Sequence, residues 1–300
     1  MPRHAWISPW RRVRHILGLN ARNLLYIQPL NPRRLFPLVD DKIRTKTVLA
    51  EAGVRTPELL LVLSNLDEVN HARESLRKAG EFVIKPARGR QGGGITVITS
   101  CEGETFTRIG GTRASWEQLR QWMGDILFGV HSVGDRDRVL IEERVHPDPA
   151  LNSLAEFGLP DVRVIVLHNR PAMAMMRLAT RASGGRANLH QGAPGIALRL
   201  SDGLAFRAVC NRRPIFRHPD NGAPLTGFRH PDWKALLHMA TRAAAAVALP
   251  YVGVDMVLDA RRGPVVMELN ARPGLEIQIV QRRGLRRRLQ RLAAAAWGLT

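Results

Sequence analysis

The sequence is poor in the residues that cross-link small domains or bind soft metals. It has two cysteines, Cys101 and Cys210, and ten histidines without a His-x-x-x-His or Cys-x-x-Cys spacing. This composition excludes a disulfide framework, makes zinc an unexpected ligand and fits a reducing compartment such as the cytoplasm. No apolar run approaches about 18 residues, so no transmembrane helix is expected. The N-terminal residues also lack the apolar core of a secretory signal.

Lysine is scarce as well. Lys and Arg together number 45 and the formal net charge is +19, but the lysines are only Lys42, Lys46, Lys78, Lys85 and Lys234. Arginine is spread along nearly the whole chain, which is typical of a compositional bias as much as of a nucleic-acid patch. Because arginine is the default cation of this sequence, a lysine inside a motif carries more information than usual.

The pattern of elements predicts an α+β protein of two parts that divide near residue 143. Residues 1–39 form a basic arm, and Asp40 and Asp41 begin a helix that ends at Gly53. Further helices are expected at residues 67–80, 116–127, 232–249 and 281–297, and strands at 58–63, 82–86, 95–99, 139–145, 162–167 and 172–179. The last helix is basic and amphipathic, with Leu285, Leu289 and Leu292 packed inward.

A β-hairpin is predicted within residues 253–274, because two apolar runs flank a short turn. A turn centred on Arg261 and Arg262 gives the pairs Val257 with Val266, Asp255 with Glu268, and Gly253 with Asn270. Side chains alternate along a strand, so Asp255, Glu268 and Asn270 share one face. The opposite, apolar face then carries Met256, Leu258, Val265, Met267 and Leu269.

Two carboxylates and a carboxamide on one strand face form a candidate magnesium site. Hard oxygen ligands suit Mg²⁺, or Mn²⁺ in its place, and Mg²⁺ usually takes waters and substrate phosphates as its other ligands. An ordinary exposed strand face remains the alternative for Asp255, Glu268 and Asn270.

Residues 85–95, KPARGRQGGGI, form a candidate phosphate-binding loop. Backbone N–H groups in such a loop can cradle an anion, and Lys85 adds a positive charge at the preceding strand end. Lys42 lies at a helix start, where a cation is mildly unfavourable unless it meets an anion. A flexible hairpin tip and a solvated lysine are the alternatives.

Other polar residues lie at strand ends and in loops. Glu142 and Glu143 end a strand and could accept hydrogen bonds from ribose, or form a salt bridge instead. Asp161 and Arg163 share one strand face. Arg186 and Asn188 could contact a phosphate or the reacting carboxyl, or could be ordinary polar loop residues. Arg272 follows Asn270 by two positions and could make bidentate contacts to phosphate.

The order of these motifs resembles the ATP-grasp ligases, and within them the α-L-glutamate ligases that add glutamate to ribosomal protein tails. The resemblance covers residues 40–279, and its most specific part is DMVLD…VMELNARPG. It implies a small subdomain at 40–143 and a large one at 144–300, which clasp ATP between antiparallel sheets. Two features depart from the family pattern. The domain that often precedes is reduced to the arm 1–39, and Arg144 stands where an uncharged residue is common.

The resemblance also assigns roles. Asp255, Glu268 and Asn270 would bind the metal, and Arg163, Arg186 and Arg272 would act on the reacting carboxylate. The nucleotide would contact Lys42, Lys85, Gly89, Gly92, Gly93, Gly94, Glu142, Glu143, Val145, Asp161, Arg186 and Asn188.

We therefore expect an ATP-dependent carboxylate–amine ligase that forms an acyl phosphate. Its partners would be ATP, a carboxylate such as glutamate and an amino acid or peptide amine. Such chemistry needs positioning and charge neutralisation rather than a protein nucleophile. On this basis Asp255→Ala should abolish turnover with little loss of fold. The alternative function is a basic protein that binds nucleic acid or an anionic surface on a degenerate nucleotide fold. The sequence leaves open a homo-oligomer.

Overall fold

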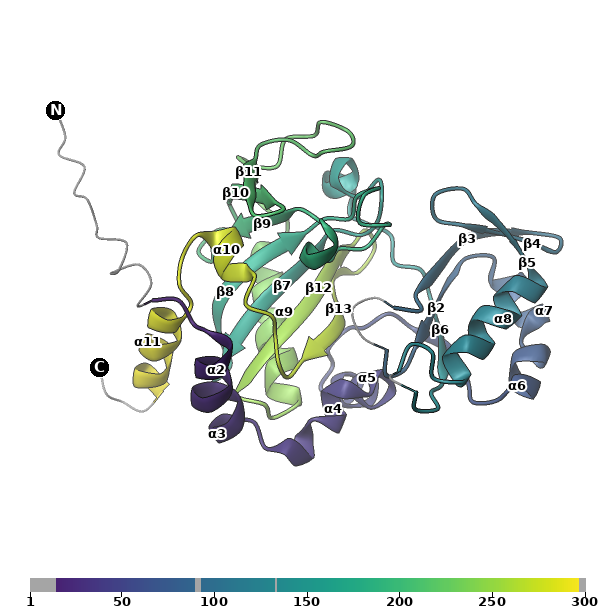
Figure 1. Cartoon of the computed structure of the whole chain (residues 1–300), viewed down its shortest axis with the longest axis horizontal. Coiled ribbons are helices and arrows are strands. Elements are labelled where there is room, and N and C mark those ends of the chain that lie inside the picture. Colours follow the sequence, from purple (N-terminus) through teal and green to yellow (C-terminus); the bar gives the residue numbers. More distant parts are fainter. Residues whose placement is uncertain (1–14, 90–92, 133, 297–300) are drawn as a thin grey trace.

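The computed structural model describes residues 15–89, 93–132 and 134–296. It contains two antiparallel sheets, each with its own helices, which lie side by side along the long axis of the molecule (Figure 1). The α+β class predicted from the sequence is confirmed. None of the helices in the described ranges has the length and hydropathy that a bilayer-spanning helix requires.

The smaller sheet has six strands in the order β1-β6-β2-β3-β4-β5. These strands are β1 Leu59–Leu63, β2 Phe82–Pro86, β3 Thr96–Glu102, β4 Thr105–Arg108, β5 Arg113–Ser115 and β6 Val139–Glu142. Its helices are α6 Leu66–His71, α7 Arg73–Ala79 and α8 Trp116–Leu127. The single helix expected at 67–80 is therefore two helices, with Ala72 between them, and it ends at Gly80 as expected.

One face of this sheet is covered by helices and the other faces the rest of the chain. Phe82 and Ile84 of β2, and Val139 and Ile141 of β6, belong to the apolar cluster under α8. Side chains alternate along a strand, so Lys85 and Glu142 lie on the opposite face. The helix side is thereby the structural side of the sheet, and the polar side carries the buried Lys85 and Glu142.

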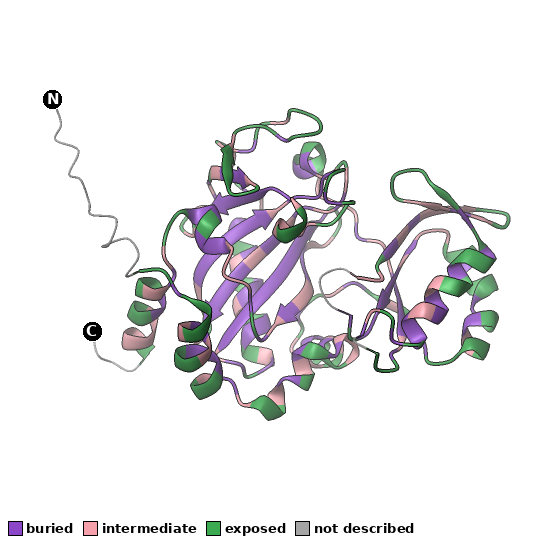
Figure 2. Ribbon diagram, in the orientation of Figure 1, coloured by how far each residue is buried: buried purple, intermediate pink, exposed green. Residues whose placement is uncertain are grey.

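The larger sheet has seven strands in the order β11-β10-β9-β8-β7-β12-β13. These are β7 Asp161–Leu167, β8 Arg170–Arg177, β9 Gly195–Leu198, β10 Ala205–Cys210, β11 Arg213–Ile215, β12 Tyr251–Asp259 and β13 Gly263–Asn270. The helices on it are α9 Trp233–Ala246, α10 Ile277–Gln281 and α11 Arg286–Ala296, and short 3-10 turns lie at η3 Pro149–Leu154 and η4 Leu189–Gln191. Its central strands are buried along their length (Figure 2).

The predicted hairpin forms, with one shift in register. Asp255 pairs with Glu268 and Gly253 with Asn270, as expected, but Val257 pairs with Val265 rather than Val266. The cause is a β-bulge opposite Asp255 and Met256, which inserts one extra residue into β13.

The bulge also changes which side chains share a face. Val265 and Met267 pack with Val257, on the side of Asp255, whereas we expected both with Met256 and Leu258. A bulge places two successive residues opposite one, so the simple alternation assumed from the sequence is interrupted at Met267.

The segment before the first strand packs on the larger sheet. It comprises α2 Leu19–Arg22, a π-helical turn η1 Asn23–Ile27, α3 Gln28–Leu30, η2 Arg33–Leu35, α4 Pro37–Asp40 and α5 Lys42–Glu51. Tyr26, Val39 and Leu49 join the core of the larger sheet. Leu49 and Val54, in the range 40–143 that we assigned to the small subdomain, belong to the core of the larger sheet. Residue 143 directly follows β6, and the division of the chain at this point stays a prediction.

The C-terminal helix packs as predicted. Leu285 and Leu289 are fully buried in the core of the larger sheet, and Leu292 packs against that core. Helix α11 begins at Arg286 rather than at residue 281, and Trp297 lies outside the described residues.

Asn31 fixes the N-terminal segment to the larger sheet. Its side chain is buried, donates to the Tyr251 carbonyl at 2.6 Å and accepts from the Tyr251 amide at 3.1 Å. We expect Asn31→Ala to lower the free energy of unfolding by about 2–4 kcal/mol, because two buried backbone groups lose their partner. Denaturant unfolding measures the change. The exposed neighbour Gln28→Ala is the control, and equal stability of the two variants would contradict this role.

Candidate active site

Three lysines converge between the two sheets. Glu142 is almost fully buried, and its two carboxylate oxygens lie 2.6 Å from the Lys85 ammonium and 2.9 Å from the Lys46 ammonium. Lys42, one turn before Lys46 on α5, donates to the carbonyl of Gly89 at 2.9 Å. The group therefore joins a helix of the larger unit to β2, β6 and the glycine-rich loop of the smaller one.

The surroundings of this cluster disfavour the charged forms of Lys42 and Lys46. Burial lowers the pKa of Lys42; Glu268 opposes this fall, and the charge of Lys85 adds to it. Burial also lowers the pKa of Lys46, against the effect of Glu142. An anion placed among these ammonium groups would stabilise their charged forms, so the geometry fits a phosphate group.

The glycines in the described part of the glycine-rich loop pack closely against neighbouring side chains of the chain. A Cβ at Gly89 would lie 2.1 Å from the Pro86 side chain, so a larger residue does not fit there. Gly94 has φ +74°, and a Cβ there would lie 2.7 Å from the His131 ring. Asp137 fixes the start of the loop, because its carboxylate accepts from the Arg88 amide at 2.9 Å. Gly93 lies in a turn before β3, and Gly92 lies outside the described residues.

A second buried cluster lies on the larger sheet, around Asp255. Arg163 on the neighbouring strand β7 donates to both Asp255 oxygens, at 2.7 and 2.5 Å. Arg177 on β8 bridges Asp255 at 2.9 Å and Asp161 at 2.5 Å. Burial raises the pKa of Asp255, but Arg163 and Arg177 lower it by more, to about 2. Burial raises the pKa of Asp161 to about 6 in spite of Arg177.

The predicted metal ligands are only partly free to bind a metal. Asn270 donates to Asp255 at 3.1 Å, so these two side chains meet as expected. Both oxygens of Asp255, however, are already paired with arginines, whose positive charges neutralise the carboxylate without a metal ion. Glu268 and Asn270 are half-exposed and bring the hard oxygen atoms that suit Mg²⁺.

The donor set therefore fits Mg²⁺ with few protein ligands. In the described ranges, no three His, Cys, Asp or Glu side chains gather closely enough to hold a metal by themselves. Magnesium commonly binds through one or two carboxylates together with substrate phosphates. Glu268, beside Lys42, is the carboxylate best placed for that role, and Asp255 orients the Asn270 amide.

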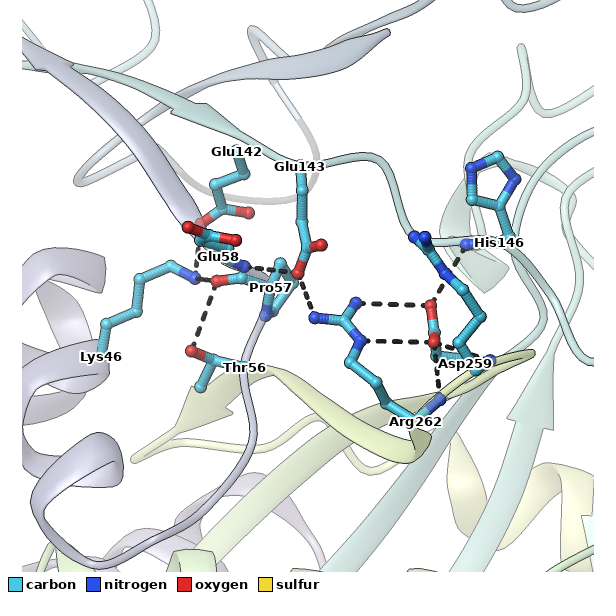
Figure 3. A network of polar contacts seen from close by, with 10 residues as sticks. Lys46, Thr56, Pro57, Glu58, Glu142, Glu143, His146, Asp259 and Arg262 are labelled. Atoms are coloured by element: carbon cyan, nitrogen blue, oxygen red, sulfur yellow. Dashed lines mark hydrogen bonds and ion pairs between the residues drawn. The ribbon is translucent and has the colours of Figure 1, made fainter. Parts of the chain in front are cut away.

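A chain of polar contacts joins the lysine cluster to the tip of the hairpin (Figure 3). Glu143 accepts from the Glu58 amide at 2.6 Å and forms an ion pair with Arg262 of the hairpin turn. Arg262 also contacts Asp259 at 3.3 Å, and Asp259 accepts from the His146 amide at 3.4 Å. The linker between the sheets, which includes residues 143–145, is thus held along the hairpin. Its Val145 packs on Val257 and Val265.

The linker contacts bear on the predicted nucleoside site. The carboxylates of Glu142 and Glu143, which we assigned to ribose, are both engaged in ion pairs within the chain. Nucleoside contacts by this linker therefore remain a proposal, and the backbone of residues 143–145 is the part best placed to make them.

The three arginines predicted to act on the carboxylate contact different partners. Arg163 is bound to Asp255, and Arg272 lies over the Phe36 ring at 4.5 Å and 3.9 Å from Asp40. Arg186 is exposed in the loop before η4, where the Asn188 side chain accepts from the His190 amide at 3.0 Å. Among the described residues no contact joins the three, so only Arg163 lies in the buried cluster.

Sequence reasoning missed Lys46, Arg177 and Arg262. Lys46 could have been found, because lysine is rare here and Lys46 stands four residues after Lys42 on the same helix face. Arg177 and Arg262 carried no signal of a site, since each is one arginine among many in an arginine-rich chain.

Comparison with known proteins identifies the family of the chain. A family model described as sugar-transfer associated ATP-grasp matches residues 21–294. The chain belongs to this ATP-grasp family, and the membership predicted from the sequence is confirmed.

Curated relatives include glutamate ligases. A protein named probable alpha-L-glutamate ligase from Sodalis glossinidius is 26% identical over 249 residues, which are 82% of this chain and 61% of the relative. A protein named ribosomal protein bS6--L-glutamate ligase from Salmonella paratyphi B is 26% identical over 259 residues, which are 86% of this chain and 64% of the relative. The chain thus spans less than two thirds of these relatives.

Solved structures support the fold. Biotin carboxylase from Campylobacter jejuni has a TM-score of 0.54 at 14% identity, over 85% of this chain and 46% of that chain. A RiPP-associated ATP-grasp ligase from Chryseobacterium gregarium has a TM-score of 0.50 at 11% identity, over 94% and 68%. The predicted ATP-grasp fold is confirmed.

The raised pKa of Asp161 predicts how the stability of the fold changes with pH. The folded protein holds the proton of the Asp161 carboxyl group more tightly than the unfolded chain does. The contribution of Asp161 to stability therefore falls as pH rises from about 4 to about 6. We expect Asp161→Asn to remove this fall, which amounts to about 2–3 kcal/mol. Denaturant unfolding at several pH values measures it. The exposed Asp67→Asn is the control, and parallel pH profiles for wild type and Asp161→Asn would show that Asp161 titrates normally.

Proposed function

We propose that this protein is an ATP-dependent carboxylate–amine ligase that works through an acyl phosphate. The observation that carries the proposal is the gathering of Lys42, Lys46 and Lys85, three of the chain's five lysines, at the glycine-rich loop. In a sequence that otherwise uses arginine, three compact cations at one place support a site for the ATP phosphates there.

The reaction needs two bond exchanges. A substrate carboxylate oxygen attacks the γ-phosphorus, the bond to the β,γ-bridging oxygen breaks, and ADP leaves. The amine nitrogen then attacks the acyl carbon, the carbon–oxygen bond to phosphate breaks, and the nitrogen loses a proton. Positioning and charge neutralisation carry most of the catalysis in phosphoryl transfer.

The residues of the chain divide these tasks. Lys42, Lys46 and Lys85 would hold phosphate oxygens, with Glu142 setting the positions of two of the three ammonium groups. Glu268 and Asn270 would hold Mg²⁺, which neutralises phosphate charge when bound. Arg163, fixed by Asp255, would face the reacting carboxylate and the oxyanion formed from it.

The names of the relatives guide the choice of substrates. We propose that the activated carboxylate or the added amino acid is glutamate or a similar acid, and that the acceptor is a peptide or a small amine. The curated relatives are named for glutamate ligation, and the arginine-rich surroundings suit an acidic substrate.

ATP binding tests the lysine site. We expect Lys85→Met to raise the Kd of Mg-ATP by about tenfold to a hundredfold, because a buried charge-assisted contact is lost. Calorimetry or thermal shift with ATP and Mg²⁺ measures this. Lys234→Met removes an exposed lysine of α9 and is the matched control. Unchanged affinity in Lys85→Met would place the nucleotide elsewhere.

The metal site is better tested at Glu268 than at Asp255. Contrary to the expectation from the sequence, Asp255→Ala should destabilise the fold by about 3–5 kcal/mol, because it leaves Arg163 buried without a carboxylate partner and removes one of the two carboxylates that pair with Arg177. Glu268→Gln should fold normally and lose the extra thermal shift that Mg²⁺ adds to ATP. Retention of that shift would exclude Glu268 as a ligand.

The ligase activity is tested by substrate screening. Amino acids and peptides are supplied with Mg-ATP, phosphate release is followed, and the amide is detected by mass. Hydroxylamine in place of the amine should trap the acyl phosphate as a hydroxamate. A stable phosphorylated product without amide or hydroxamate would identify a phosphotransferase instead.

A further inference from the structure

A run of exposed aliphatic side chains lies near the N-terminal end of the described chain. Ile16, Leu19, Leu24 and Leu25 are 50%, 61%, 63% and 48% exposed. They belong to the extended residues before α2 and to the helical segment formed by α2 and η1. Clustered apolar side chains on a surface commonly mark a site of interaction.

The helical segment buries a charged side chain and exposes apolar ones. Its inner side carries Tyr26 and Ile27, which are buried, and Arg22, whose guanidinium donates to the Pro273 carbonyl at 2.9 Å. Its exposed residues between 19 and 30 are leucines, Asn20, Gln28 and Pro29, without a charge. The sequence has no Asp or Glu before Asp40.

A basic helix lies against this segment. The Arg286 amide of α11 donates to the His15 carbonyl at 3.1 Å, and the charge of Arg286 opposes the rise that burial causes in the pKa of Tyr26. Helices α2, α3 and α11 lie at one end of the molecule, and their outer faces are exposed (Figures 1 and 2).

The outer face of α11 carries arginines that lack acidic neighbours in the sequence. Leu285 and Leu289 point inward, whereas Arg287 and Arg291 are exposed one turn apart. The sequence has no Asp or Glu after Glu276. Desolvation and the like charges of Arg291 and Arg283 lower the pKa of Arg288, so this end of the chain gathers positive charge that an external anion would stabilise.

We propose that Ile16, Leu19, Leu24, Leu25, Arg287 and Arg291 form a leucine–arginine surface that docks the protein on an anionic lipid bilayer. Exposed aliphatic side chains enter the boundary of the acyl region, and flanking arginines meet lipid phosphates, which is the pattern of peripheral membrane binding. A nucleic acid would use the arginines but offers no apolar phase for four aliphatic side chains. The proposal is independent of the ligase activity.

Vesicle sedimentation tests the docking surface with the full chain at about 0.15 M salt, where charges beyond about 8 Å are screened. We expect binding to phosphatidylglycerol–phosphatidylcholine vesicles and much weaker binding to phosphatidylcholine alone. Arg287→Gln/Arg291→Gln should weaken binding about 30-fold, from about 1 kcal/mol per arginine. Leu24→Gln/Leu25→Gln should weaken it about tenfold or more, because apolar burial is lost.

Matched variants elsewhere control for the high net charge. Arg113→Gln/Arg120→Gln removes two exposed arginines of the smaller unit, and Phe128→Gln/Val130→Gln removes two exposed apolar side chains there. Both should bind vesicles like the wild type. Equal losses in the control and surface variants would overturn the proposal, because they would show general charge attraction only.

Two other outcomes would also overturn the proposal. Binding to an oligonucleotide that is unaffected by Leu24→Gln/Leu25→Gln, without vesicle binding, would assign the arginines to nucleic acid. A dimer in light scattering that Leu24→Gln/Leu25→Gln dissociates, again without vesicle binding, would assign the leucines to a second copy of the chain. Mg-ATP binding should be unchanged in all these variants, so failure here is distinguishable from failure of the ligase proposal.

Discussion

The arrangement of the candidate active site depends on the buried pairing of Asp255 with two arginines. Asp255 lies on β12, Arg163 on β7 and Arg177 on β8, so one carboxylate connects three adjacent strands. A buried charge without a partner is costly, and each member of this cluster therefore restricts the positions of the others. The Asn270 amide, which donates to the same carboxylate, is oriented by this pairing.

A second constraint joins the two units. Glu142 ends β6 between Lys85 of its own sheet and Lys46 of α5, a helix that packs on the other sheet. The next residue, Glu143, is held by Arg262 at the hairpin tip. The linker thus connects the lysines that we propose to bind phosphate to the hairpin that carries Glu268 and Asn270, and the proposed ATP site depends on both units.

Much of this site could be predicted from the sequence, for local reasons. The helix at Lys42, the strand that carries Lys85 and the pairing of Asp255 with Glu268 follow from capping, apolar runs and strand alternation. The bulge at Met267 could not be predicted, because one inserted residue leaves no distinct local pattern and the facing residues Val265 and Val266 are chemically alike. The role of Arg177 also has no local signal, since it depends on two carboxylates 16 and 78 positions away.

The sequence by itself determined the fold class, the hairpin and the residue types from which a phosphate and magnesium site can be built. It did so because hydrophobic periodicity and the rarity of lysine are properties of the chain alone. Only the tertiary structure decided which charges neutralise one another: Asp255 pairs with arginines, Glu142 with lysines and Glu143 with Arg262. Pairing depends on distance and burial, which are fixed when the two sheets and their linker pack together.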